Sequence, residues 1–94
     1  MSETKQYIVR ILTEDVNRNG VKRLLRGLRV DYTMLFGHGS WLGEPEKSLV
    51  IELTNTSAAR TRQIATAIKV LNKQEAVLVQ RIATCNEIIG GSNE

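Results

Sequence analysis

The sequence predicts one small α+β domain with the element order β-α-β-β-α-β. Its 94 residues leave no room for a second hydrophobic core, since domains typically run to 100 residues or more. Three stretches carry apolar residues at every second position, the period of a strand, a fourth is a short apolar run, and two carry apolar residues at helical spacing. The order in which these stretches follow one another along the chain gives the predicted architecture.

The first half of the chain is expected to fold as strand, helix and strand. The stretch Tyr7–Leu12 alternates in a β-branched sequence and predicts the first strand. A helix is expected over residues 17–28, with Asn17 or Asn19 as its N-cap and Gly27 where it closes. From residue 30 the period changes to two, which predicts a second strand. The residues expected on one face of that strand are Val30, Tyr32, Met34 and Phe36.

An eleven-residue loop, residues 37–47, is expected to join the second and third strands. It contains three of the seven glycines and the only histidine, tryptophan and proline. Such a loop is either a binding element or a long hairpin turn. We expect Pro45 to stop the two strands from pairing as far as the loop tip, because proline lacks the N–H that a strand ladder uses.

The second half repeats the pattern of strand, helix and strand. A strand is expected around residues 49–53, and the apolar run 76–82 is too short for a helix and predicts the fourth strand. A helix is expected from Ala58 to about Asn72, capped by Thr56 or Ser57. Its expected buried stripe is Ile64, Ala67, Ile68 and Leu71.

This order, with right-handed crossovers, predicts a ferredoxin-like sandwich: a four-stranded antiparallel sheet with both helices on one face. The single domain is expected to span residues 1–94, with disordered tails at 1–6 and 90–94.

Composition excludes several classes of protein. One cysteine and one histidine leave no intrachain disulfide and no set of metal ligands. The apolar runs are too short for a membrane span or a secretion signal, so we expect a cytoplasmic protein with no membrane partner and no cofactor. We expect no enzyme, because His38 has no catalytic context and Cys85 is expected to be a buried structural thiol.

Both expected helices carry bases and no acid. Five bases lie between residues 16 and 30 and four between 54 and 74, so these stretches hold nine of the 13 bases. One interpretation is a surface for an acidic protein or nucleic acid; the other is a solvated face, or one that meets the acidic loops of a neighbouring subunit. The candidate residues for an anionic partner are Arg18, Lys22, Arg23, Arg26, Arg29, Arg62 and Lys69.

The sheet face away from the helices is predicted to be apolar and to be covered by a second copy of the chain. This follows if the odd-numbered positions of the central strands pack under the helices; the alternative is that the alternation is inverted on one strand. Arg10 and Glu52 are then expected to pair across adjacent strands. No aromatic residue falls on the central strands of this face, unlike in the RNA-reading version of the fold. The candidate interface residues are Ile8, Arg10, Leu12, Leu35, Val50, Glu52, Leu78 and Ile82.

Two segments carry a family resemblance. They are the spacing Gly37-x-Gly39-x-Trp41-x-Gly43-x-x-Glu46-x-Ser48-Leu49-Val50-Ile51-Glu52 and the run Asn72-Lys73-Gln74-Glu75-Ala76-Val77-Leu78-Val79. Through them the chain resembles the PII signalling and CutA group, and in particular small PII-like proteins of bacteria and phages. The resemblance implies a homotrimer whose sheets face inward, clefts between subunits that bind nucleotides or other small effectors, and a loop that contacts partner proteins. The basic phosphate-binding segment of PII is reduced here to Lys73.

The function expected from these observations is a small homo-oligomeric, trimeric regulatory or effector-binding module that binds a nucleotide or another small anion at subunit clefts. The alternative is a phage or bacterial interaction protein that uses its basic helices to bind nucleic acid or an acidic protein. The candidate ligand-binding residues are Gly37, His38, Gly39, Trp41, Glu46 and Lys73.

Overall fold

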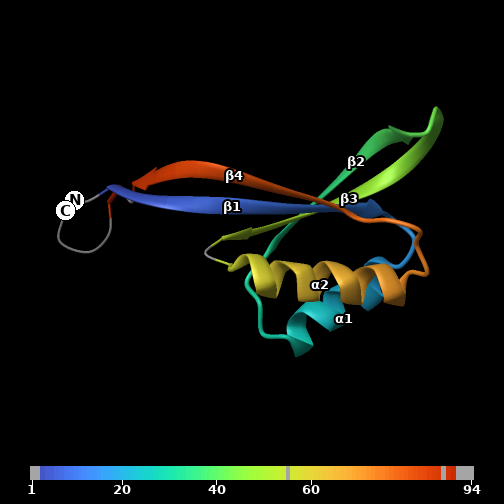
Figure 1. Ribbon diagram of the computed structural model, residues 1–94, viewed down its shortest axis with the longest axis horizontal. Helices are drawn as coiled ribbons and strands as arrows, with labels where there is room; N and C mark the ends of the chain where they lie inside the picture. The colour runs from blue at the N-terminus through green and yellow to red at the C-terminus, as the bar shows by residue number, and fades with distance from the viewer. Residues whose placement is uncertain (1–2, 55, 88, 91–94) are drawn as a thin grey trace.

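The computed structural model describes residues 3–54, 56–87 and 89–90 and contains the predicted element order (Figure 1). The ferredoxin-like fold is therefore confirmed. The elements in chain order are β1 Glu3–Glu14, α1 Arg18–Gly27, β2 Thr33–Trp41, β3 Glu44–Thr54, α2 Ala58–Leu71 and β4 Leu78–Glu87.

The four strands form one antiparallel sheet in the order β2-β3-β1-β4, and both helices lie on one of its faces (Figure 1). The register places Ile11 opposite Ile51 and Val9 opposite Leu53. These side chains are fully buried under the helices, so the predicted alternation of the central strands holds and its inversion on either strand is excluded.

The core lies between the sheet and the two helices. Val21 and Leu25 of α1 and Ile64 and Ile68 of α2 are fully buried against the central strands. The predicted stripe of α2 is wrong in part: Leu71 is 41% exposed and Ala67 is only partly buried. The side of α2 that packs on the sheet includes, besides the two isoleucines, Thr61 and Ala65.

The helix termini are capped as the sequence predicts. At α1, the Asn17 side chain accepts a hydrogen bond of 3.2 Å from the N–H of Gly20, and at α2 the Ser57 hydroxyl oxygen accepts one of 3.1 Å from the N–H of Arg60. Both helices end in the same backbone motif, in which a basic residue, Arg29 or Lys73, takes a left-handed φ of 57° or 54°.

The predicted loop at residues 37–47 is instead a continuous β-hairpin. β2 and β3 pair up to Trp41 and Glu44, and the connecting residues Leu42 and Gly43 have positive φ angles of 53° and 82°, as a type I′ turn requires. Pro45 does not stop the pairing. Because the pair that closes the turn is hydrogen-bonded, the next pair, Pro45 with Ser40, falls at a non-hydrogen-bonded position where the missing N–H costs no ladder bond.

The outer strands are longer than predicted. β1 begins at Glu3, so residues 3–6 belong to a strand and not to the expected N-terminal tail, and β4 extends to Glu87. The remainder of the expected tails, residues 1–2 and 91–94, lies outside the described residues. Cys85 lies within β4 and is exposed, so its expected burial is wrong. The reason is that β1 and β4 run on beyond the helices, and no second layer covers the sheet there (Figure 1).

Candidate functional site

A pocket of about 650 Å³ lies where β1 ends, which we call the β1-end pocket. Three segments far apart in sequence form its wall: the end of β1 with the residues that follow it, 12–16, the half of the β2–β3 hairpin nearer its turn, and the turn between α2 and β4, residues 72–76. The N–H of Asp15 donates a hydrogen bond of 2.8 Å to the carbonyl of Lys47, which ties the end of β1 to the hairpin. The pocket is therefore built on joined elements of the fold.

The turn between α2 and β4 is held from two sides. Its backbone closes α2 through hydrogen bonds from the N–H groups of Lys73 and Gln74 to the carbonyls of Val70 and Lys69, at 3.2 and 3.0 Å. The hydroxyl of Thr13, a nearly buried β1 residue, donates a hydrogen bond to the Gln74 side-chain carbonyl. This side of the pocket is fixed before any ligand binds.

Two features of the turn suit a ligand. The side-chain nitrogen and oxygen of Asn72, which lines the pocket, are buried and have no hydrogen-bond partner within the described residues. A buried amide without a partner costs about 1–3 kcal/mol, and a ligand that offers both a donor and an acceptor removes this cost. Lys73 is the one basic residue among the described lining residues, which also include Glu14, Glu46 and Glu75. A phosphate bound here would have Lys73 as its one described basic partner on this chain and would have to lie away from the three carboxylates.

The open face of the sheet, on the side away from the helices, carries rows of side chains that cross the strands. One row is apolar and runs Leu35, Val50, Leu12, Leu78. The next row is polar and contains the predicted ion pair, in which Arg10 Nε lies 2.7 Å from Glu52 Oε2. Beyond it, Ile8 lies opposite Ile82, so the pair is flanked by apolar side chains on both sides.

This open face is incompletely buried in the single chain. Leu35, Leu78 and Ile82 are 48%, 46% and 38% exposed. The face adjoins the β1-end pocket, because Leu12 and Leu78 belong both to the apolar row and to the pocket wall. Anything that covers the open face therefore also borders the pocket.

Comparison with known proteins gives structural likeness only. No protein-family model and no curated protein matches the chain. Among solved structures, CPII of Thiomonas intermedia K12, a nitrogen regulatory PII-like protein bound to ADP, AMP and bicarbonate, has a TM-score of 0.66 at 11% identity and covers 93% of this chain and 98% of its own. The chain has the fold of PII-like proteins.

Two further solved structures support this fold assignment. The GlnK–ATP complex of B. subtilis has a TM-score of 0.52 at 20% identity, covering 83% of this chain and 82% of its own. A PII-like signaling protein of Thermus thermophilus has a TM-score of 0.51 at 18% identity, covering 92% of both chains. The expected PII-like fold is thus confirmed, whereas the likeness to CutA and the phage source stay predictions.

Within this PII-like fold, the six predicted ligand-binding residues separate into two groups. Gly39, Glu46 and Lys73 meet in the β1-end pocket. Gly37 lies beside it, opposite Ser48 on the hairpin, and His38 is exposed opposite Lys47 on the other face. Trp41 is the last residue of β2, next to the turn of the hairpin, and its side chain lies outside the described part.

Gly39 has a steric reason to be glycine. A β-carbon at this position would lie 3.0 Å from the hydroxyl oxygen of Ser48 on the paired strand. Among the pocket residues that sequence reasoning missed are three polar ones, Thr13, Asn72 and Gln74. Asn72 and Gln74 flank Lys73 in the run that carries the resemblance, so a search for polar side chains just after the second helix would have found them.

The predicted anionic-partner residues are not equivalent. Arg18 forms an ion pair of 2.6 Å with Asp15 and lies 3.9 Å from the centre of the Phe36 ring. This hydrogen bond from Arg18 lowers the pKa of Asp15 below its usual value. Lys22 is partly buried, and Arg29 lies in the turn after α1. The bases that are exposed on the helices and form no ion pair with any described residue are Arg23, Arg26, Arg62 and Lys69.

The described residues contain neither a candidate membrane-spanning helix nor a cluster of metal-ligating side chains. No helix in residues 3–54 and 56–87 is long and apolar enough to cross a membrane. No three histidine, cysteine, aspartate or glutamate side chains in that part of the chain lie close enough together to hold a metal ion.

Proposed function

We propose that the chain is a PII-like effector-binding module that assembles through its open face and binds a nucleotide or another small anion in the β1-end pocket. The observation that carries the proposal is the pocket itself, where a fixed turn places Lys73 on the wall next to the buried, unpartnered Asn72 amide. It is supported by the ligands of solved proteins that share the fold: CPII is bound to ADP, AMP and bicarbonate, and GlnK to ATP.

The pocket offers both apolar and polar side chains to a bound nucleotide. The apolar side chains of Leu12, Val16 and Leu78 form a surface on which a base can pack. The Asn72 amide, whose nitrogen and oxygen are buried in the unliganded chain, can bond the polar edge of the ligand once its side chain turns toward the pocket. Lys73 supplies the cation for a phosphate.

The backbone of Lys73 takes an unfavourable conformation. An L-residue in the left-handed region costs about 1–2 kcal/mol, and glycine is the usual residue where a helix closes in this way. The same motif at Arg29 shows that this conformation is not by itself a sign of binding, so the case for Lys73 rests on its place in the pocket wall. Its charge also complements the carboxyl end of the α2 dipole, which is the structural explanation that the experiment below must separate from binding.

Assembly and binding are linked in this proposal. A second copy of the chain packed on the apolar row covers Leu12 and Leu78, and so closes the side of the pocket that the single chain leaves open. We assign the pocket to binding, because His38 is not among its described lining residues and its hydroxyl groups have no histidine beside them to act as a general base.

Thermal melting with ADP, AMP, ATP and bicarbonate tests the proposed function. A ligand present at 100 times its dissociation constant adds about 2.7 kcal/mol, which raises the Tm of a domain this size by roughly 10 to 20 °C. We expect this rise with at least one of the four. In Lys73→Gly the rise should disappear, while the Tm without ligand changes by only a few degrees, since relief of the left-handed backbone offsets the loss of the base.

Arg29→Gly is the matched control for this experiment. Arg29 closes α1 through the same backbone motif and at nearly the same φ as Lys73, but it does not line the β1-end pocket. It should keep the full ligand-induced rise. A rise that survives in Lys73→Gly, or that is lost equally in both variants, would show that the anion binds elsewhere, and no rise with any of the four would remove the proposed ligand class.

A further inference from the structure

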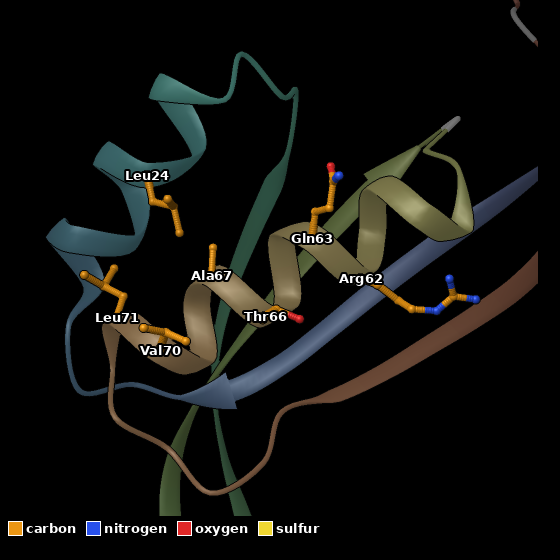
Figure 2. Close-up of a pocket in the computed structure, with 7 residues that line it drawn as sticks. All are labelled: Leu24, Arg62, Gln63, Thr66, Ala67, Val70 and Leu71. Carbon is orange, nitrogen blue, oxygen red and sulfur yellow. The ribbon is translucent and has the colours of Figure 1, made fainter.

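A second cavity lies on the outer surface of the helix layer, on the side away from the sheet. This groove between α1 and α2 has a volume of about 740 Å³ (Figure 2). Figure 2 shows Leu24 projecting from α1 toward α2, where Ala67, Val70 and Leu71 complete an apolar floor. The groove shares no lining residue with the β1-end pocket, so it is independent of the proposed effector site.

Two apolar residues of the groove, Val70 and Leu71, are not part of the protein's own core. Val70 is 69% exposed and Leu71 is 41% exposed, although both lie on a helix whose opposite side is fully buried. Assembly through the open face does not cover them, because they lie on the other side of the molecule. An exposed apolar strip that neither the core nor the sheet face accounts for indicates contact with a further partner.

The charge around the groove restricts that partner. Neither α1 nor α2 contains an acidic residue. Arg62 lines the groove, and Arg23 and Lys69 are exposed next to the lining residues Leu24 and Val70. Like charges gathered along helices repel one another, so carboxylates of a partner would gain directly from Arg62 and through the longer-range field from Arg23 and Lys69, which are not among the lining residues. The same charge opposes docking of a second helix layer of this chain, which would bring bases against bases.

The apolar floor favours a protein segment over nucleic acid. The lining contains no aromatic side chain on which a base could stack, and a phosphate backbone would gain nothing from Leu24, Ala67 and Val70. An amphipathic helix, in contrast, offers an apolar stripe for the floor and a charged remainder for the rim.

We propose that the groove between α1 and α2 docks an acidic amphipathic helix of another protein. Apolar side chains spaced at i, i+3, i+4 and i+7 lie along Leu24, Ala67 and Val70, and the flanking carboxylates of the helix lie against Arg23, Arg62 and Lys69.

Fluorescence anisotropy with a designed probe tests this proposal. The probe is a fluorescein-labelled helical peptide with leucine at i, i+3, i+4 and i+7 and glutamate at most other positions. We expect Val70→Glu, which puts a carboxylate in the floor, to weaken binding at least about tenfold. Val70→Gln, which removes the apolar group without adding charge, should weaken it less.

Ala59→Glu is the matched control variant, because Ala59 is an exposed α2 residue outside the groove and the change in charge is the same. It should bind the probe nearly as well as the unmodified chain. A peptide with lysine in place of glutamate, and one with serine in place of leucine, should not bind.

Three results of these binding measurements would contradict the proposal. The probe fails to bind at about 1 mM protein, Val70→Glu and Ala59→Glu weaken its binding equally, or a single-stranded oligonucleotide binds in its place with the same dependence on Val70. The proposal is also wrong if the chain alone forms larger assemblies that Val70→Glu dissolves, since the occupant would then be a second copy.

Discussion

Val50→Lys is expected to convert the assembled protein into folded monomers. Val50 lies within the apolar row, between Leu35 and Leu12, at the centre of the face proposed to be covered by other copies. An ammonium buried in an apolar interface without a partner costs several kcal/mol, which corresponds to a loss of assembly of more than about 100-fold. In the monomer the same position is only partly buried and the lysine stem can reach solvent, so the fold should survive. Light scattering gives the mass, and circular dichroism checks the fold.

The control for this prediction is Val79→Lys. Val79 is also an exposed apolar residue of the sheet, 39% exposed, but it lies opposite Ile11 and hence on the helix side. The control should keep the assembled mass. Because Leu12 and Leu78 border the β1-end pocket, the monomeric variant should also lose most of the ligand-induced rise in Tm. A Val50→Lys protein that keeps the assembled mass would place the interface elsewhere.

The ion pair between Arg10 and Glu52 should be worth far more in the assembled protein than in the monomer. In the single chain the two side chains are 40% and 24% exposed, and a pair of this kind contributes about 0–1 kcal/mol. Covered by another copy, the pair becomes buried, and removing one partner leaves a buried charge at a cost of about 3–5 kcal/mol. We therefore expect Arg10→Met and Glu52→Leu each to be strongly destabilising, and the double variant to recover most of the loss.

The measurement is a double-mutant cycle on the unfolding free energy, determined by denaturant titration at a concentration where the protein is assembled. Repeated in the Val50→Lys background, the coupling between Arg10 and Glu52 should fall below about 1 kcal/mol. The exposed pair of Asp15 and Arg18 is the control, since its coupling should be the same in both backgrounds. Equal coupling of Arg10 and Glu52 in the two backgrounds would mean that the face stays in contact with water.

The alternation of the central strands predicted most of the fold, because each strand has one buried face and a shift of one residue would bury the wrong side chains. That is why the pairing of Arg10 with Glu52 was predictable from sequence. The hairpin was not. Glycines and a proline between residues 37 and 47 indicated a loop, and only the pairing register shows that Pro45 falls where its missing N–H does no harm.

Helical periodicity alone also did not predict which apolar residues of α2 lie in the core. Ile64 and Ile68 fix the side that packs on the sheet, but Ala67 and Leu71 lie at helical spacing from them and suit either the core or a neighbouring surface. Their exposure creates the groove on the helix layer, which the sequence did not predict. In the β1-end pocket, Lys73 was found because it is basic, whereas Asn72 and Thr13 are common residues that gain meaning only from burial and proximity.

The claim on which the account depends is that copies of this chain cover the open face beside the pocket. The mass of the unmodified protein, measured by light scattering over a range of concentrations, tests it most directly. We predict three times the chain mass of 10.5 kDa, independent of dilution over the working range. A mass of one chain at every concentration, with the apolar row of the sheet still in solvent, would contradict it.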